Sequence, residues 1–349
     1  MTVELTIDGR RIAADEPPYI IAELSANHNG SLERALELID AAVATGADAI
    51  KIQTYTADSI TIDSSREEFK IKGGLWDGYT LHKLYQQAHT PYEWHARLFE
   101  RARKHGRTIF SSPFDNSAID LLVSLDAPAF KIASFEVVDL PLIAYAASHG
   151  KPLIISTGMA NLGEISDAIN TARESGAGGV ALLHCVSSYP APIDDANIST
   201  VPHLGKAFAC VSGLSDHLPG SAAAIASVVL GGCIVEKHFT LARADGGLDA
   251  PFSLEPNEFQ QFVEDCKTAW RAIGKVNYDP LGSERSSKQI RRSIFAVRDI
   301  RKGECFTNEN VRSIRPGYGL APKYLPGLLG KTASRDIAYG EPMSWNMIE

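Results

Sequence analysis

Eight short runs of apolar, β-prone residues recur through the first three quarters of the chain and constrain its fold most strongly. Most of these runs are almost continuously hydrophobic, which is typical of parallel strands covered on both faces. Helical patterns lie between most of them, and eight such units over about 250 residues predict a TIM barrel. A doubly wound sheet is the structural alternative, although it would rarely use eight evenly spaced units. The expected strands are Tyr19–Leu24, Asp48–Gln53, Thr108–Ser112, Phe130–Ser134, Leu153–Ser156, Val180–His184, Val211–Leu214 and Cys233–Lys237.

Two of the intervening helices carry a capping-box pattern at their start. In Thr90-Pro91-Tyr92-Glu93 the proline stands at the expected first helical position, and this helix should end at Gly106. Asn161 with Glu164 predicts a second helix, which should end at Gly176.

The remainder of the chain divides into smaller segments. Residues 1–18 contain an Asp8-Gly9 turn and predict a hairpin that caps one end of a barrel spanning 19–274. Residues 275–289 are polar and predict a linker, and residues 290–349 predict a small β-rich domain with strands at Ser293–Val297 and Asn310–Ile314. The segment 55–89 is longer than an ordinary strand-to-helix connection, which is typical of a functional loop.

Composition limits the partners of the chain. The net charge is −8 and the charges are spread along the chain without a basic run, so nucleic acid is not an expected main partner. Five cysteines without a CxxC pair fit neither a disulfide framework nor a zinc ribbon and predict a reducing cytoplasm. The N-terminus has no signal-peptide pattern, and the longest apolar stretch, 222–235, is shorter than the roughly 18 residues of a membrane span. We therefore expect a cytoplasmic protein without a membrane partner.

Polar side chains at the carboxyl ends of the predicted strands should converge on one mouth of the barrel. Lys51 and Lys131 lie within apolar strands, where an ammonium group is costly unless it meets an anion. The alternative is that either lysine reaches solvent or pairs with Glu23 or Glu136. Hydroxyl groups that could surround the same anion occur at Ser112, Ser134 and Ser187. Together these residues predict a pocket for a phosphate or a carboxylate.

A pair of histidines indicates a metal site. His217 and His238 end consecutive strands, and two imidazoles with open positions for oxygen ligands suit a divalent ion such as Mn²⁺ or Mg²⁺. A closed zinc site would need more His or Cys ligands. Taken singly, either histidine is more often structural. His28 is a weaker candidate because Asn27-His28-Asn29-Gly30 also fits a simple turn.

Several motifs, in order along nearly the whole chain, resemble those of the sialic acid synthase family. The segment from Asp299 to Gly317 resembles the antifreeze-like (SAF) domain that these enzymes carry. The resemblance therefore implies a TIM barrel followed by a small SAF domain. The barrel motifs are Ile20–Gly30, Ala47–Tyr55, Phe130–Glu136, Gly213–His217 and Glu236–Phe239.

Within that family the chain most resembles the pseudaminic acid synthase branch, through Lys72–Gly78, Thr90–His95 and Ser111–Phe114. The resemblance implies a transferase that condenses phosphoenolpyruvate with 2,4-diacetamido-2,4,6-trideoxy-L-altrose to form pseudaminic acid, a nine-carbon acid used on bacterial surfaces. A synthase for N-acetylneuraminic or legionaminic acid is the alternative, and a non-catalytic carbohydrate-binding protein is a remote one. Three positions depart from common family patterns: Ser187, Leu218 and Ala242.

The resemblance also implies roles for individual residues. Glu23 would deprotonate the attacking water and Glu136 would position sugar hydroxyls, while Glu236 could do either. Arg315 would reach the sugar from the other subunit of a domain-swapped homodimer; alternatively, it is a surface arginine in a turn. The expected catalytic residues are Glu23, Glu136 and the metal ligands His217 and His238. The expected substrate-binding residues are Lys51, Gln53, Ser112, Lys131, Ser134, Ser187, Tyr189, Ser215, Asp249 and Arg315.

Overall fold

The computed structural model describes residues 3–349 and divides the chain into two compact units, one ending at Gly274 and the other spanning Lys275–Glu349. Residues 1 and 2, the first two of the predicted hairpin segment, lie outside the described residues. Each unit has its own buried apolar core. Within residues 3–349, every helix is too short or too polar to cross a lipid bilayer.

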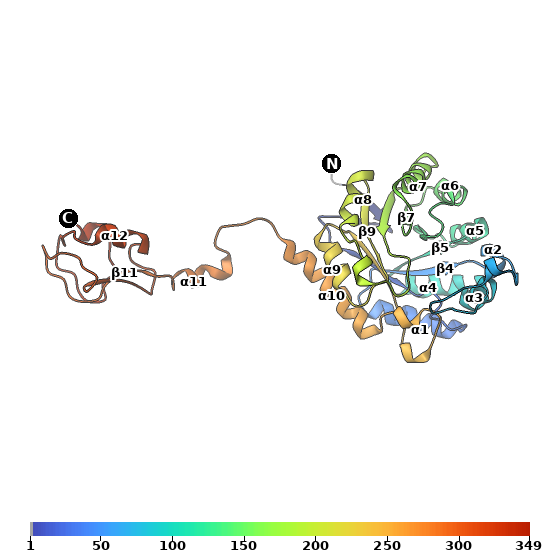
Figure 1. Ribbon diagram of the computed structural model, residues 1–349, viewed down its shortest axis with the longest axis horizontal. Helices are drawn as coiled ribbons and strands as arrows, with labels where there is room; N and C mark the ends of the chain where they lie inside the picture. The colour runs from blue at the N-terminus through green and yellow to red at the C-terminus, as the bar shows by residue number, and fades with distance from the viewer. Residues whose placement is uncertain (1–2) are drawn as a thin grey trace. The chain divides into compact units, whose positions relative to one another are not determined.

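The first unit is a closed barrel of eight parallel strands, which confirms the TIM-barrel prediction (Figure 1). Neighbouring strands follow chain order, and β10 closes the ring by pairing with β3. All eight apolar runs predicted from the sequence form these strands. The strands are β3 (Tyr19–Glu23), β4 (Ala49–Thr54), β5 (Thr108–Pro113), β6 (Phe130–Ile132), β7 (Leu153–Ser156), β8 (Val180–His184), β9 (Val211–Asp216) and β10 (Ile234–His238).

A ring of helices surrounds the strands (Figure 1). Their apolar stripes explain this placement: α1 buries Ala35, Leu38, Ile39 and Ala42, which share one face at helical spacing. The N-cap Ser31 accepts a hydrogen bond from the Arg34 backbone N–H at the start of this helix. The surrounding helices are α1 (Leu32–Ala44), α4 (His95–Lys104), α5 (Asn116–Ser124), α6 (Leu140–Ser148), α7 (Leu162–Glu174), α8 (Thr200–Phe208), α9 (Ala222–Val229) and α10 (Pro256–Ile273).

One of the two capping-box predictions is confirmed and the other is wrong. Asn161 and Glu164 form a reciprocal capping box at the start of α7. Thr90, by contrast, caps no helix: it is buried and its hydroxyl lies 3.4 Å from Nε2 of His28. A 3₁₀ turn at Tyr92–Trp94 comes first, and α4 begins only at His95. The tertiary contact with His28 has therefore replaced the local cap.

A hairpin closes the barrel at the amino ends of its strands. Strands β1 (Glu4–Ile7) and β2 (Arg10–Ala13) pair antiparallel around the predicted turn. Leu5, Ile7 and Ile12 are buried in one cluster with the barrel side chains Tyr19 and Phe110. Because this end is filled by apolar side chains, a polar site can open only at the carboxyl ends of the strands.

The long connection after β4 contains secondary structure of its own. It comprises α2 (Ala57–Ile60), a 3₁₀ turn at Glu67–Phe69 and α3 (Leu81–Ala88). Between the 3₁₀ turn and α3, the indole Nε1 of Trp76 donates to the Leu248 carbonyl at 3.1 Å. This bond ties the connection to the loop after β10.

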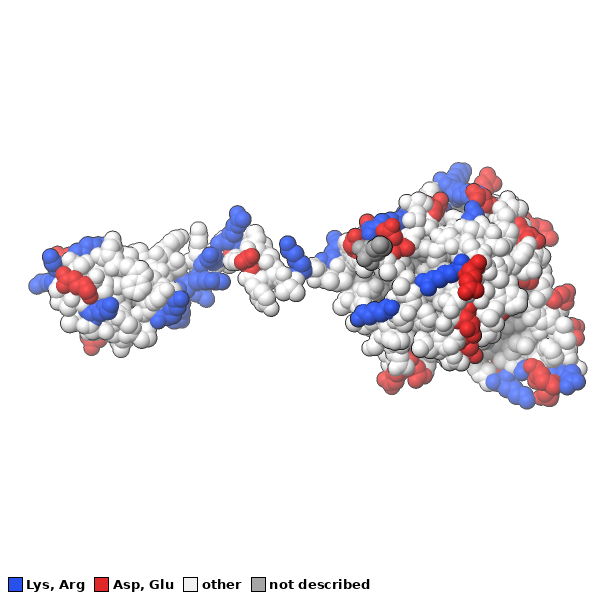
Figure 2. Space-filling view, turned by 90° about the horizontal axis from the view of Figure 1, so that it is seen from above, with Lys and Arg blue, Asp and Glu red and all other residues white. Residues whose placement is uncertain are grey.

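The second unit is small and β-rich. Strands β11 (Ser293–Ala296) and β12 (Val311–Ile314) pair antiparallel, as the sequence predicted, and short helices lie at α11 (Arg285–Lys288) and α12 (Leu325–Leu328). Basic side chains gather on its first segment, residues 275–292 (Figure 2). They are Lys275, Arg285, Lys288, Arg291 and Arg292, against two acidic residues, Asp279 and Glu284.

Candidate active site

A cavity of about 600 Å³ opens at the carboxyl ends of the barrel strands. Every site residue that the sequence predicted within the barrel lines this cavity, whereas Arg315 is exposed on the second unit. The predicted residues in the lining are Glu23, Lys51, Gln53, Ser112, Lys131, Ser134, Glu136, Ser187, Tyr189, Ser215, His217, Glu236, His238 and Asp249.

Strand register explains why residues far apart in the sequence meet here. Glu23 of β3 stands beside Lys51 of β4 on one side and His238 of β10 on the other. Side chains alternate between the two faces of a strand, so laterally paired residues of parallel strands share a face. The site is therefore a direct consequence of the barrel register.

Lys51 is held by two carboxylates. Its Nζ lies 2.7 Å from Oε2 of Glu23 and 3.4 Å from Oε1 of Glu236, and it donates to the Ser112 hydroxyl at 3.3 Å. Burial raises the pKa of Glu23 to about 7, against the opposing charge of Lys51. For Glu236, burial is outweighed by Lys131 and Lys51, which lower its pKa. Lys51 therefore pairs with carboxylates, which was one of the alternatives that the sequence left open.

Lys131 has no carboxylate within ion-pair distance among residues 3–349. Its ammonium group is buried and donates to the Ser156 hydroxyl at 2.6 Å and the Ile132 carbonyl at 3.3 Å. Burial lowers the pKa of Lys131 because the charged form is poorly solvated there. An anion entering the cavity would supply the missing counter-charge.

Two serine hydroxyls meet on the same side of the cavity. Oγ of Ser134 and Oγ of Ser187 are 2.8 Å apart. Gly158 makes this possible: it has a φ of +47°, and a Cβ at this position would come within 2.5 Å of Ser134 and 2.7 Å of Ser187. The glycine that follows β7 therefore leaves room for the two hydroxyls.

His217 and His238 lie side by side, with ring centroids 5.5 Å apart. Burial lowers the pKa of His217 to about 4 and the pKa of His238 well below its usual value, so both imidazoles are neutral at neutral pH. Nδ1 of His217 lies 2.9 Å from the Val186 carbonyl, which fixes this ring with its Nε2 lone pair free. Nδ1 of His238 is buried without a hydrogen-bond partner in the described chain.

These two neutral histidines fit a divalent metal ion that takes its other ligands from substrate or water. Among residues 3–349, no cluster of three or more His, Cys, Asp or Glu residues is arranged to enclose an ion. Two histidines leave positions free for other ligands, which suits a catalytic ion better than a structural one.

A hydrogen-bonded chain of polar groups lines another part of the cavity. Nε2 of Gln53 donates to Oε1 of Glu23 and to Oγ of Ser25, both at 3.1 Å. The Ser25 hydroxyl in turn donates to Oδ2 of Asp249. Burial raises the pKa of Asp249. This row of acceptors and donors could bind the hydroxyl and amide groups of a sugar.

Aromatic rings cover the histidines. The ring of Tyr189 lies 4.4 Å from His217, and that of Phe252 lies 4.9 Å from His238. Trp76 of the long connection packs against the rings of Tyr189 and Phe252, with centroid distances of 6.0 and 6.5 Å. The cavity therefore has one apolar side next to the imidazoles.

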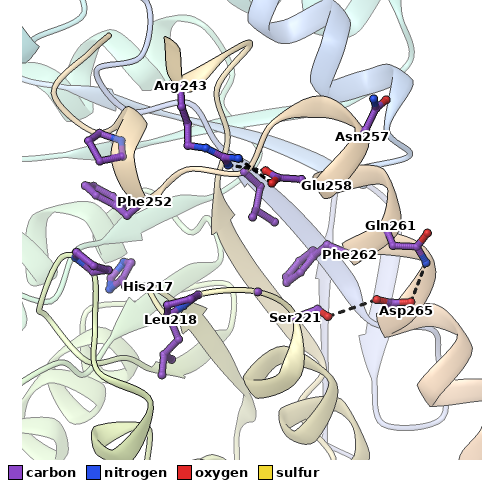
Figure 3. A pocket seen from close by; sticks show the side chains of 15 residues that line it. His217, Leu218, Ser221, Arg243, Phe252, Asn257, Glu258, Gln261, Phe262 and Asp265 are labelled. Carbon is purple, nitrogen blue, oxygen red and sulfur yellow. Dashed lines mark hydrogen bonds and ion pairs between the residues drawn. The ribbon is translucent and has the colours of Figure 1, made fainter. Parts of the chain in front are cut away.

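Figure 3 shows the residues that line a second cavity, of about 610 Å³. His217 and Phe252 line both cavities and so form part of the wall between them. Leu218, one of the departures from the family pattern, lines the second cavity together with Phe262. On the rim, Arg243 pairs with Glu258, and Asp265 accepts from Gln261 and Ser221 (Figure 3).

The sequence analysis missed several cavity residues, among them Ser25, Cys185 and Phe252. Cys185 directly follows β8 and Ser25 is the second residue after β3, so a list that extended two residues past each strand would have included both. Phe252 lies on a 3₁₀ turn that follows the loop after β10, where no periodic pattern indicates which way a side chain points.

Comparison with known proteins agrees with this architecture. The NeuB family model matches residues 38–278 and the SAF domain model matches residues 291–349. The chain belongs to the NeuB family.

Individual relatives resemble the chain over most of its length. The chain is 44% identical to the pseudaminic acid synthase of Helicobacter pylori, over 96% of this chain and 98% of the relative. It is 36% identical to the N,N'-diacetyllegionaminic acid synthase of Campylobacter jejuni, over 92% and 97% of the two chains. The crystal structure of N-acetylneuraminic acid synthetase from Leptospira borgpetersenii in complex with citrate has a TM-score of 0.73 and 31% identity, covering 82% of this chain and 95% of that one.

Glu136 should make stability depend on pH. Its Oε2 is buried without a hydrogen-bond partner in the described chain, and burial raises the pKa of this carboxyl to about 7, with Lys131 opposing and Asp139 adding to the shift. Between about pH 4.5 and 7 the unfolded chain releases this proton while the folded chain keeps it, so the folded state loses stability as pH rises. The free energy of unfolding of Glu136→Gln minus that of the wild type should therefore increase by about 2 kcal/mol from pH 5 to pH 8.

Urea unfolding of both proteins at the two pH values measures this difference. Glu37→Gln, on the exposed face of α1, controls for the loss of a surface carboxylate. An equal effect of Glu136→Gln at pH 5 and pH 8 would show that the carboxyl is solvated and ionised throughout.

Proposed function

We propose that this protein is a pseudaminic acid synthase, which joins phosphoenolpyruvate to 2,4-diacetamido-2,4,6-trideoxy-L-altrose and releases phosphate. The observation that carries the proposal is that one cavity holds both a buried Lys131, which has no ion-pair partner in the described chain, and two neutral histidines. The higher identity to a pseudaminic than to a legionaminic acid synthase supports the choice of sugar.

Phosphoenolpyruvate would occupy the side of the cavity formed by β6, β7 and β8. Lys131 would bind its phosphate, and the hydroxyls of Ser134 and Ser187, which lie together, would donate to the phosphate oxygens. Ser112, which accepts a hydrogen bond from Lys51, would complete this half of the site. A charge-assisted contact of this kind is stronger than a neutral hydrogen bond because one partner is ionised.

The sugar would occupy the opposite side, near Gln53 and Asp249. Glu136 and Asp249 would accept hydrogen bonds from sugar hydroxyl or amide groups, and Tyr189 and Ser215 would contact the sugar or the carboxylate of phosphoenolpyruvate. His217 and His238 would hold a divalent ion, Mn²⁺ or Mg²⁺. When bound, such an ion polarises a carbonyl oxygen and stabilises negative charge that develops on it.

The reaction begins when the enol carbon of phosphoenolpyruvate forms a carbon–carbon bond with the aldehyde carbon of the open-chain sugar. The aldehyde oxygen becomes an alkoxide that then takes up a proton. C2 of the phosphoenolpyruvate unit gains cationic character and is attacked by water, whose proton passes to a carboxylate base. Glu23, fixed between Lys51 and Gln53, is the best-placed candidate for that base. Cleavage of the bond between C2 and the phosphate oxygen then yields the keto acid and inorganic phosphate.

Phosphate release from phosphoenolpyruvate tests this function directly. With Mn²⁺ present, release should require an acetamido sugar and should be fastest with the 2,4,6-trideoxy-L-altrose derivative. Trace turnover of N-acetylmannosamine is compatible with the proposal, because a small apolar difference between substrates gives only about 10–200-fold discrimination. Preference for N-acetylmannosamine or for the legionaminic acid precursor would indicate one of the sister synthases. No release with any of these sugars would favour a non-catalytic binding protein.

Lys131→Met tests the assignment of the phosphate half of the site. Loss of a charge-assisted contact worth about 1.5–3 kcal/mol should raise the KM for phosphoenolpyruvate roughly 10- to 150-fold, with a much smaller effect on the KM for the sugar. Steady-state kinetics with each substrate varied in turn measures both constants. Lys151→Met is the control, since Lys151 pairs with Asp126 on the outer surface. A larger change in the KM for the sugar would mean that the two half-sites have been exchanged.

We also infer that Arg315 acts on the cavity of a second copy of the chain. Arg315 is exposed, and its guanidinium offers a planar set of donors suited to a polar substrate. Residues 275–290 expose large apolar side chains, among them Val276 and Tyr278, at 88% and 96% of their full accessible surface. Apolar groups of this size favour burial against a partner, and a two-fold dimer is the commonest closed assembly.

Mixing two inactive variants tests this inference. If Arg315 acts in trans, a 1:1 mixture of Arg315→Ala and His217→Ala chains should recover about a quarter of wild-type turnover, because half of the dimers are mixed and each holds one intact site. A mixture of His217→Ala and His238→Ala should recover nothing, since both residues belong to one barrel. No recovery in the first mixture, despite demonstrated subunit exchange, would assign Arg315 to its own chain or to no catalytic role.

A further inference from the structure

A second buried ion pair lies behind the histidines, outside the cavity. Nζ of Lys237 is 2.9 Å from Oδ2 of Asp216, and the two side chains are 1% and 0% exposed. Lys237 follows Glu236 and precedes His238 on β10, so its side chain points to the opposite face of the strand from these two cavity residues.

The ion pair contacts the residues that precede and follow His217 in the chain. Asp216 directly precedes this histidine, and Oδ1 of Asp216 accepts from the Leu218 backbone N–H at 2.9 Å. The Leu218 carbonyl, on the other side of His217, accepts from Nζ of Lys237. A single ammonium group therefore contacts the side-chain carboxylate of the residue before His217 and the backbone carbonyl of the residue after it.

The same ammonium group connects the two histidines. Lys237 is the immediate neighbour of His238, and Lys237 and Asp216 are paired residues at the end of the β9–β10 ladder. Beyond this point no strand pairing between β9 and β10 holds His217, which begins the loop after β9. The His217 carbonyl accepts instead from the Ala191 backbone N–H at 3.0 Å, and the contact of Lys237 with the Leu218 carbonyl is a second attachment of this turn.

Apolar residues exclude water from the pair. Leu218 is 2% exposed, and the ring of Phe262 lies 5.9 Å from Nζ of Lys237. Both residues also line the second cavity (Figure 3), so they separate the ion pair from that opening. Desolvating two charges usually costs as much as their attraction returns, so a buried pair of this kind adds little net stability over an apolar pair of similar volume. The ion pair can therefore fix the geometry of the residues around it rather than stabilise the fold.

We propose that Lys237 and Asp216 are positioning residues that fix the orientation of His217 relative to His238. One consequence of this proposal, that the ring geometry sets the affinity for a divalent ion, rests on the proposed function. The structural part of the proposal concerns the two rings alone and can be tested without metal.

The test compares Lys237→Met, Asp216→Asn and the double variant Lys237→Met/Asp216→Asn. Lys237→Met leaves a buried carboxylate without a counter-charge and should lower the Tm, whereas the double variant is neutral and should recover most of the loss. Asp216→Asn keeps an oxygen that can accept from Leu218 and provides a milder change if Lys237→Met fails to fold.

Two readouts separate positioning from stability. In metal-free protein labelled with ¹⁵N-histidine, the ring signals of His217 should report the tautomer fixed by its bond to the Val186 carbonyl. In the double variant we expect a mixed tautomer despite the recovered Tm. The Kd for Mn²⁺, measured by calorimetry, should rise about 10- to 100-fold, as is usual when a group that orients a metal ligand is removed.

Lys151→Met/Asp126→Asn, which removes an exposed pair of the same chemistry, should change neither readout. Wild-type His217 signals in the stable double variant, or a Kd for Mn²⁺ that recovers together with the Tm, would overturn the proposal. A wild-type protein that binds no Mn²⁺ would instead contradict the metal role in the proposed function, while the ring signals would still decide whether the pair positions His217.

Discussion

The cost of burying charge governs the barrel mouth. An ionised side chain in a closed apolar barrel is unstable unless a partner lies within a few ångströms, and the strand register decides which partners are available. Lys51 meets Glu23 across the β3–β4 ladder, and it also reaches Glu236 on the other side of β3. One ammonium group thus lies between two carboxylates that would otherwise repel each other more strongly. The remaining features of the site depend on how this charge balance is completed.

On one side of the cavity, a buried ammonium group lacks a carboxylate within ion-pair distance in the described chain. Lys131 is as deeply buried as Lys51 but has only the Ser156 hydroxyl and a backbone carbonyl as partners in the described chain. Neutral His217 and His238 add lone pairs but no charge. A site with an unpaired buried cation and free imidazole nitrogens is prepared for an anionic ligand together with a cation. Under the proposed function, phosphoenolpyruvate and a divalent ion would supply these two charges, whereas a neutral sugar would supply neither.

The sequence predicted those parts of the protein that depend on periodicity. Continuous apolar runs identified all eight strands because both faces of each strand are covered, and strand ends identified the cavity residues because parallel strands end on one side. Features set by long-range contacts were not predictable. Thr90 has an ideal local cap pattern, yet a contact with His28, 62 residues away, takes its hydroxyl. Phe252 reaches His238 from a 3₁₀ turn whose direction only the packed loops determine. The charge balance of Lys51 likewise required the register, which the sequence alone left open.

Three consecutive residues of β10 show how alternation sorts these charges. Glu236 faces Lys51 inside the barrel, Lys237 faces Asp216 outside it, and His238 faces the cavity again. A shift of one residue in the pairing of β10 would turn Lys237 into the cavity and move Glu236 against the apolar helices. Both ion pairs would then be lost together, leaving buried charges that cost several kcal/mol each. The two ion pairs on opposite faces of β10 therefore specify its register more strictly than its apolar residues, Ile234 and Val235, could do alone, since a strand that is apolar on both faces tolerates slippage.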